Sequence, residues 1–104
     1  MVLIYIVAKD KEEGKKISLE LLENKYAHSI NIFPEILSLK QENGKITEYS
    51  QTLVTVKTKA LLYPRVEQLV QKVQKINDPV IFSLPITQLH QDLFDRIQRN
   101  TMKV

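Results

Sequence analysis

The side chains that most often bind metals are scarce in this sequence. There are two histidines, His28 and His90, separated by 62 positions, and there is no cysteine. Zinc and copper sites use several histidine or cysteine ligands at short spacings, and the chain has no such motif. We keep His28 as a weak metal candidate, because oligomerisation could bring copies of it, or an acidic neighbour, together around Cu or Zn.

Catalytic motifs are also missing. No thiol nucleophile is available, and no serine stands in a Gly-x-Ser-x-Gly context. The segment Gly14-Lys15-Lys16 lacks the first glycine of a phosphate-binding loop, and no Gly-x-Gly-x-x-Gly occurs. We therefore expect a protein that is not an enzyme, and we assign no catalytic residue.

Composition and charge favour an ordinary folded protein. Of the 104 residues, 43% are hydrophobic and 26% are charged, which predicts one domain over residues 1–104. The net charge of +3 comes from lysines and arginines interspersed with acids, which favours a mixed solvated surface over a nucleic-acid footprint. The absence of cysteine suits a reducing compartment, and the longest apolar run, Val2–Ala8, is too short to cross a bilayer. We expect a cytoplasmic protein without nucleic-acid or membrane partners.

The first half of the chain predicts a strand, a helix and a long hairpin. Val2–Ala8 is apolar at nearly every position, as in a strand buried on both faces. Asp10 and Glu13 form a capping-box pattern that opens a helix ending near Asn24. Alternating residues from Ala27 onwards, and again over residues 45–58, predict two strands joined at Asn43-Gly44, the favoured pair for a type I′ turn.

The first strand of this hairpin contains a proline. The alternation places four side chains on one face, namely Ile30, Ile32, Pro34 and Ile36. Because proline cannot donate a main-chain hydrogen bond, Pro34 indicates an edge strand or a bulge.

The second half of the chain predicts a helix, a strand and a final helix. Pro64 suits the first turn of a helix that runs to about Lys75, and Val80–Pro85 forms a strand. The last helix should turn four side chains inward, Leu89, Leu93, Phe94 and Ile97. The resulting order predicts an α+β fold, a ferredoxin-like βαββαβ sandwich with an antiparallel sheet and an added C-terminal helix.

The strands carry more apolar residues than two helices can cover. Val2–Ala8, Leu53–Val56 and Val80–Leu84 place apolar side chains on both faces of the sheet. Leaving each of them wet costs about 1.5–3 kcal/mol relative to burial, so we expect copies of the chain to associate in a closed ring. Both hairpin strands exceed the usual length of about 5–6 residues, and we expect them to reach a neighbouring subunit. The alternative is a hairpin bent over its own sheet.

Four segments of the chain resemble the CutA family of divalent-cation tolerance proteins. They are NIFPEILSL at residues 31–39, GKI at 44–46, TLVTVKTK at 52–59 and DPVIFSLPI at 78–86. The resemblance extends from Leu3 to about Arg99. It implies an intertwined homotrimer similar to the PII-type signal proteins, tolerance of copper and other divalent metals, an unidentified protein partner, and no established catalysis.

Eleven positions match the family pattern: Asn31, Pro34, Ser38, Gly44, Lys45, Ile46, Leu53, Lys57, Thr58, Pro79 and Pro85. From the resemblance we take Asn31, Lys45, Lys57 and Thr58 as candidates for a cleft between subunits. The candidates for the trimer interface are Pro34, Ile36, Ile46, Leu53, Val54 and Val56. For Lys57 and Thr58 an interfacial ion pair remains open beside contact with a ligand.

The chain departs from the family pattern at positions that matter for ligands. Ile6 and Gln74 occupy positions that hold copper ligands in some members, so a Cys/His copper site cannot be transferred. Lys40 and Glu42 replace aromatic residues of the hairpin, and Gln51 replaces an acid. No cofactor is therefore assigned. A divalent metal such as Cu or Zn remains one hypothesis, and a scaffold trimer that binds no ligand is the other.

Overall fold

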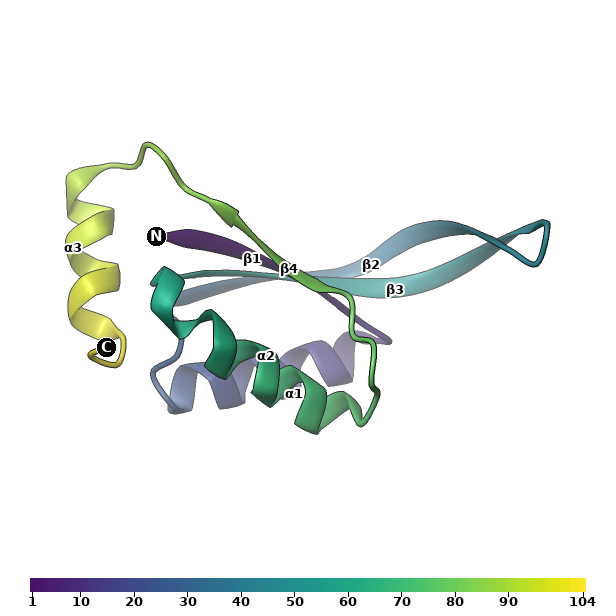
Figure 1. Ribbon diagram of the computed structural model, residues 1–104, viewed down its shortest axis with the longest axis horizontal. Coiled ribbons are helices and arrows are strands. Elements are labelled where there is room, and N and C mark those ends of the chain that lie inside the picture. Colours follow the sequence, from purple (N-terminus) through teal and green to yellow (C-terminus); the bar gives the residue numbers. More distant parts are fainter.

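The structure, a computed structural model, describes residues 1–104 and contains one four-stranded antiparallel sheet with helices on one of its faces (Figure 1). The strands are β1 (Val2–Ala8), β2 (Ser29–Glu42), β3 (Lys45–Thr58) and β4 (Ile81–Pro85), in the spatial order β2-β3-β1-β4. The helices are α1 (Lys11–Glu23), the short 3₁₀ helix η1 (Ala60–Leu62), α2 (Tyr63–Gln74) and α3 (Gln91–Asn100). The ferredoxin-like βαββαβ prediction with its C-terminal helix is confirmed.

The start of α1 is determined by its capping residues. The Asp10 side chain accepts a hydrogen bond from the Glu13 N–H at 2.9 Å, and the Glu13 carboxylate accepts one from the Lys9 N–H at 3.0 Å. These bonds satisfy main-chain donors that the first helical turn leaves free. The helix ends at Asn24, as predicted.

A glycine allows α1 to lie close to the sheet. A Cβ atom at Gly14 would come within 3.0 Å of Thr52 Cγ2 and 3.3 Å of Val54 Cγ2. The helix therefore approaches β3 more closely than a larger residue would permit.

The hydrophobic core lies between the sheet and the helices α1 and α2 (Figure 1). Its fully buried members include Ile4, Ile6, Ile17, Leu21, Val54, Val56, Val66 and Val70. Along β1 every second residue is buried and the intervening ones are half-buried. The prediction that β1 is buried on both faces thus holds for one face of the protomer only.

Strands β2 and β3 form a long arm, which we define as residues 36–51. Asn43 and Gly44 at its turn both have positive φ, 52° and 75°, as a type I′ turn requires. The arm extends away from the body and contributes to a longest molecular dimension of 46 Å (Figure 1). The long hairpin is confirmed, and the alternative of a hairpin bent over its own sheet is wrong.

The predicted bulge occurs at Pro34 in the edge strand β2. Phe33 pairs with Leu53 and Ile36 pairs with Gln51, so two residues of β2 stand opposite the single residue Thr52. The Thr52 hydroxyl donates to the Pro34 carbonyl at 2.8 Å. Because the bulge shifts the alternation, Ile36 lies on the face of Phe33, which corrects the prediction that it shares a face with the preceding isoleucines.

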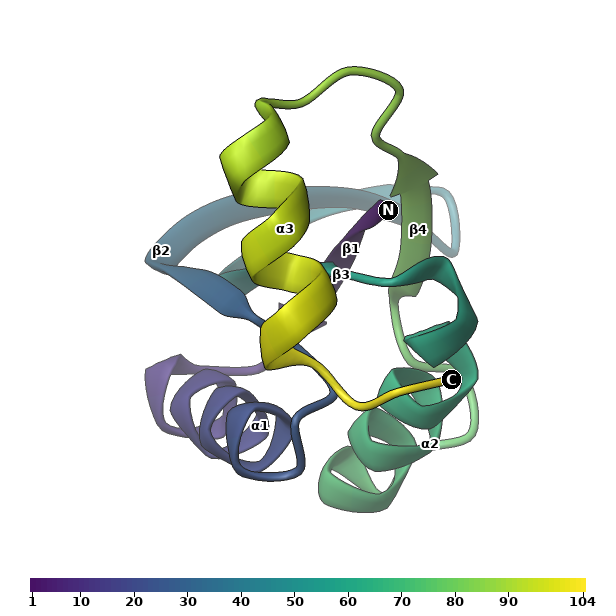
Figure 2. The same ribbon diagram turned by 90° about the vertical axis from the view of Figure 1, so that its left-hand side faces the viewer.

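The last helix closes the end of the sheet at which the chain begins. Figure 2 shows α3 lying across this end, with the chain beyond it leading toward α2. The Met102 N–H donates to the Lys25 carbonyl at 2.7 Å, which ties the segment after α3 to the connection after α1. Ile97 is fully buried, whereas Phe94 lines a pocket beside Met1 and keeps 36% of its surface exposed, so the predicted inward face of α3 is buried only in part. None of the helices combines the length and the apolar character needed to cross a bilayer.

Candidate functional site

The sheet face opposite α1 and α2 is uncovered in the protomer (Figure 1). We call it the open face, and its apolar side chains are Leu3, Tyr5, Val7, Phe33, Leu53, Phe82 and Leu84. The rings of Tyr5 and Phe82 are stacked with centroids 4.8 Å apart. Phe82 and Leu84 keep 44% and 49% of their surface exposed. An apolar patch of this kind marks an interaction surface.

A polar cleft lies where the arm leaves the body. We call it the base cleft; it encloses about 330 Å³ and is lined by Val7, Lys9, Glu13, Lys40, Gln51, Gln74, Ile76, Asp78 and Val80. A second hollow of about 470 Å³ shares four of these residues and continues over the open face toward Tyr5 and Leu53. The cleft therefore opens onto the open face.

The base cleft combines charges of both signs. Lys9 and Lys40 supply two cations, while Glu13 and Asp78 supply two carboxylates. Such a lining suits a ligand that carries both donors and acceptors, and it can hold either an anion or a cation at different points. No group of three or more His, Cys, Asp or Glu side chains suited to a metal ion occurs in the protomer.

Gln74 connects three parts of the fold at this cleft. Its Nε2 donates to the Val7 carbonyl and to Glu13 Oε1, each at 3.0 Å, which links α2 to β1 and α1. Its Oε1 is buried and accepts no hydrogen bond. An unpaired buried acceptor costs about 1–3 kcal/mol, so a donor brought to this point would stabilise the cleft.

The four residues predicted to line a cleft between subunits do not gather at one place in the protomer. Asn31 and Lys57 meet on the open face, where Lys57 Nζ donates to Asn31 Oδ1 at 3.3 Å. Lys45 lies at the tip of the arm. Thr58 is fully buried and its hydroxyl donates to the Tyr26 carbonyl at 2.6 Å, so its predicted place in a cleft is wrong.

The predicted interface residues also divide between two surfaces. Val54 and Val56 are fully buried beneath the helices, so they offer no surface to a second chain and their prediction is wrong. Successive side chains of β3 point to opposite faces of the sheet, and the helices cover the face on which Val54 and Val56 lie. Leu53 and Ile36 are half-buried, Ile46 is 75% exposed, and Pro34 is exposed at the bulge.

His28, the weak metal candidate, lies in the connection between α1 and β2. It is half-buried, and its Nδ1 is 3.4 Å from Asn100 Nδ2. This contact joins the connection to the end of α3, and no carboxylate forms an ion pair with His28. Within one protomer its surroundings are those of a structural histidine.

The tip of the arm carries a small polar cluster. Glu42 accepts hydrogen bonds from the Tyr49 hydroxyl and from the Thr47 hydroxyl, the latter at 2.7 Å. Lys40 Nζ lies 5.0 Å from the centre of the Tyr49 ring. The hydrogen bond from Tyr49, with that from Thr47 and the charge of Lys40, lowers the pKa of the Glu42 carboxyl.

This cluster gives a testable pH dependence. Because the pKa of Glu42 is lowered by folding, its stabilisation is present above the unfolded-state pKa and is lost as pH falls through the folded-state value. Tyr49→Phe removes the largest cause and should raise the pKa of Glu42 toward its ordinary value, measured by carbon NMR titration. An unaltered Glu42 titration in the variant would show that Tyr49 is not its partner.

Comparison with known proteins identifies the chain's relationships. The CutA1 divalent ion tolerance protein family matches residues 2–100. The chain belongs to this family. It is 26% identical over 98 residues to the divalent-cation tolerance protein CutA of Thermus thermophilus, covering 94% of this chain and 95% of that protein. It is 34% identical over 94 residues to the protein of the same description from Archaeoglobus fulgidus, covering 90% and 91%.

Solved structures of these relatives have the same fold. The divalent cation tolerance protein of Thermus thermophilus superposes with a TM-score of 0.91 at 26% identity, covering 98% of this chain and all of that one. The periplasmic divalent cation tolerance protein CutA of Archaeoglobus fulgidus gives 0.89 at 32% identity, covering 96% and 98%. Against plant and mammalian CutA proteins, by contrast, the chain spans about half of the relative's length, as in Arabidopsis thaliana with 47%.

Several departures from the family pattern lie at the base cleft, whereas Ile6 lies in the core and Glu42 at the tip of the arm. Lys40, Gln51 and Gln74 stand where the family pattern has an aromatic residue, an acid and, in some members, a copper ligand, and all three line this one cleft. The sequence marks these positions only as isolated exceptions, because they lie on three different elements. Lys9, Glu13 and Asp78 carry no sequence signal for a site and are recognised only by their place around the cleft.

Proposed function

We propose that this protein acts as a non-catalytic homotrimer of the divalent-ion tolerance type, in which a ligand held between subunits changes what the assembly presents to a protein partner. The observation that carries the proposal is the open face, whose apolar side chains continue from β4 across β1 to the arm. A neighbouring copy is the simplest cover for such a face, because a closed ring buries it on every subunit.

The arm is the element suited to making that ring. It carries exposed apolar side chains beyond the reach of its own helices, among them Leu37 at 65% and Leu39 at 60% exposure. An arm that packs on an adjacent subunit buries these side chains and places its Lys40 near the neighbour's surface. Each base cleft would then be completed by a second chain.

The ligand of this cleft should differ from copper held by Cys and His. The lining supplies amide, carboxylate and ammonium groups, which bind hard cations or small anions better than they bind soft metals. A divalent metal would need side chains from more than one subunit. In a PII-like mechanism, occupancy of the cleft selects one arrangement of the nearby segment 75–80 for a partner to recognise.

A scaffold trimer without a ligand is the second candidate. It is favoured by the hydrogen bonds that already engage the cleft's polar groups, since Glu13 and Gln74 bind each other and the main chain of Lys9 and Val7. In this case the cleft is a structural joint between α1, α2 and β1, and assembly itself is the function.

We place the protein in the cytoplasm within this proposal. The lack of cysteine suits a reducing compartment. One relative of known structure, from Archaeoglobus fulgidus, is described as periplasmic. Fractionation of the source cells, with a cytoplasmic and a periplasmic marker protein, tests this point directly.

Titration calorimetry distinguishes the ligand-binding candidate from the scaffold. We expect Mg(II), Zn(II) or ATP to bind the purified trimer, and we expect Glu13→Gln combined with Asp78→Asn to abolish binding of a metal. Lys9→Ala combined with Lys40→Ala should instead abolish binding of ATP, because each pair removes one sign of charge from the cleft. Glu48→Gln, outside the cleft, is the matched control and should bind as the parent does. No heat with any of the three ligands would support the scaffold.

A further inference from the structure

Another hollow lies at the end of β1 that is opposite the base cleft, where α3 crosses the sheet. It encloses about 740 Å³, and half of its lining residues are cationic: Lys25, Lys59, Arg99 and Lys103. No aspartate or glutamate lines it. We call it the basic hollow. Since β1 rises about 3.3 Å per residue over its length, the hollow lies on the order of 20 Å from the base cleft and is a separate feature.

The four cations of the basic hollow have no carboxylate partner. The one ion pair within 4.0 Å in the structure joins His90 and Asp92, which lie elsewhere. Lys59 Nζ donates one hydrogen bond, to the Met102 carbonyl at 3.0 Å, and an ammonium group has further donors. Arg99 follows the last buried residue of α3, where the negative end of the helix dipole also favours cations. The hollow therefore presents unpaired donors and positive charge.

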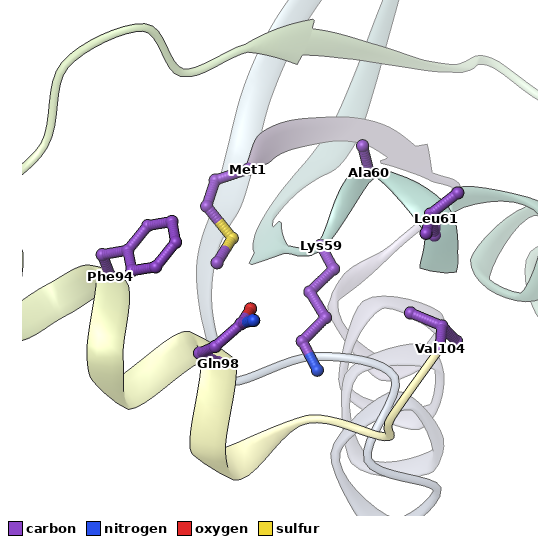
Figure 3. Close-up of a pocket in the computed structure, with 7 residues that line it drawn as sticks. All are labelled: Met1, Lys59, Ala60, Leu61, Phe94, Gln98 and Val104. Carbon is purple, nitrogen blue, oxygen red and sulfur yellow. The ribbon is translucent and has the colours of Figure 1, made fainter.

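An apolar pocket opens directly beside the basic hollow. It encloses about 280 Å³ and shares Lys59, Gln98 and Val104 with it. Figure 3 shows Met1 and Phe94 flanking this pocket on one side and Leu61 on the other, with Lys59 crossing between them toward the chain that leads to Val104. Leu61 is 72% exposed and Phe94 is 36% exposed, so this pocket is not filled by the protein's own side chains.

We infer that the basic hollow and the apolar pocket beside it together form a binding site for a small amphiphilic anion. Such a ligand is a phosphate or carboxylate attached to an apolar chain or ring. The anionic group lies among Lys25, Lys59, Arg99 and Lys103, and the apolar group packs on Met1, Leu61 and Phe94. Charge complementarity selects an anion, because the four cations form no ion pair within 4.0 Å and repel one another until a negative group enters. The adjoining apolar walls select an anion with a hydrophobic part, since burial of that part releases surface from water.

Lys59 is the residue that joins the two halves of this site. Its aliphatic stem forms part of the apolar pocket, while its ammonium lies at the edge of the basic hollow near Met102. A ligand that reaches both parts must pass this side chain. Lys59 therefore lies beside the bond that joins the apolar part of the ligand to its charged group.

The test compares three probes on the whole protein by titration calorimetry: octyl phosphate below its micellar concentration, inorganic phosphate, and 1-octanol. Octyl phosphate should bind at least about tenfold more tightly than either of the others, because only it engages both parts of the site. Lys59→Met combined with Arg99→Gln should weaken octyl phosphate by about tenfold or more. Leu61→Ser should weaken octyl phosphate and leave inorganic phosphate unchanged. Lys15→Met combined with Lys16→Gln, exposed on α1, removes the same charge and should change nothing.

Several outcomes would overturn this inference. Equal affinity for 1-octanol and octyl phosphate would leave an apolar pocket without anion selection. If the Lys15 and Lys16 control lost as much affinity for octyl phosphate, the effect would come from the net charge of the protein and not from a site. Binding to phosphatidylglycerol vesicles without binding of octyl phosphate would replace a small ligand by a membrane surface. The proposed ligand at the base cleft is independent of all three, because the variants and probes differ.

Discussion

Replacing Leu53 by aspartate is expected to convert the assembled protein into monomers. Leu53 lies at the centre of the open face, between Phe33 on β2 and Val7 on β1. The change forfeits about 1.5–3 kcal/mol of apolar burial per subunit and leaves an unpaired carboxylate in the interface, which costs several kcal/mol more. Light scattering should therefore report the 12.1 kDa mass of one chain in place of a mass three times larger.

Two further variants make this test decisive. Phe82→Asp lies on the same face at an edge strand and is 44% exposed, so it disturbs the protomer's own core less than Leu53→Asp does. Leu19→Asp, on the outer surface of α1 and 54% exposed, is the matched control and should remain assembled. An intact trimer from both open-face variants would show that the interface lies elsewhere.

Shortening the arm should separate folding of the body from assembly. Deletion of Leu39–Glu42 together with Lys45–Glu48 leaves Ser38 and Tyr49 beside the Asn43-Gly44 turn. These two residues already pair across the hairpin, as Glu42 and Lys45 do at the present turn. Because four is an even number, removing four residues from each strand leaves every remaining side chain on its present face of the sheet. It also leaves the alternation of hydrogen-bonded and non-hydrogen-bonded pairs unchanged. The body should fold with its core unchanged, while the trimer dissociates.

The measurement for the shortened arm combines circular dichroism with light scattering over a dilution series. We expect unchanged strand and helix signals from the body and a 12.1 kDa species at micromolar concentration. The physical reason is that the deleted residues are exposed or half-buried and none of them belongs to the hydrophobic core; Lys40, which lines the base cleft, is the one cleft residue lost with them. A shortened protein that stays trimeric on dilution would contradict the role of the arm in assembly.

The chain keeps the family's arm while its base cleft is altered. Asn43-Gly44 still builds the turn, and Pro34 still makes the bulge that bends β2. At the tip, Glu42, Thr47 and Tyr49 form a hydrogen-bonded cluster in this chain. In the cleft, Gln74 supplies an amide where some relatives supply a metal ligand. The arm and the base cleft are different parts of this chain, so the two proposals can be tested separately.

Local signals in the sequence predicted most of the secondary structure. Asp10 and Glu13 predicted the start of α1, because a cap acts through residues only three positions apart. Asn43-Gly44 predicted the hairpin, because these residues tolerate the positive φ of its turn. Starts that depend on packing were less accurate, since β2 begins at Ser29 instead of Ala27. Ala27 is buried beneath the helices and is placed by tertiary contacts.

The sequence by itself determined the order of elements, the long hairpin, the bulge at Pro34 and the excess of apolar side chains on the strands. Only the tertiary structure decided which of those side chains are free. Alternation defines two faces of β3 but does not say which one the helices cover, so Val54 and Val56 proved buried while Leu53 faces outward. The base cleft depends on tertiary structure in the same way. Lys40, Gln51 and Gln74 lie on separate elements, and long-range docking of α2 and the arm against β1 brings them together.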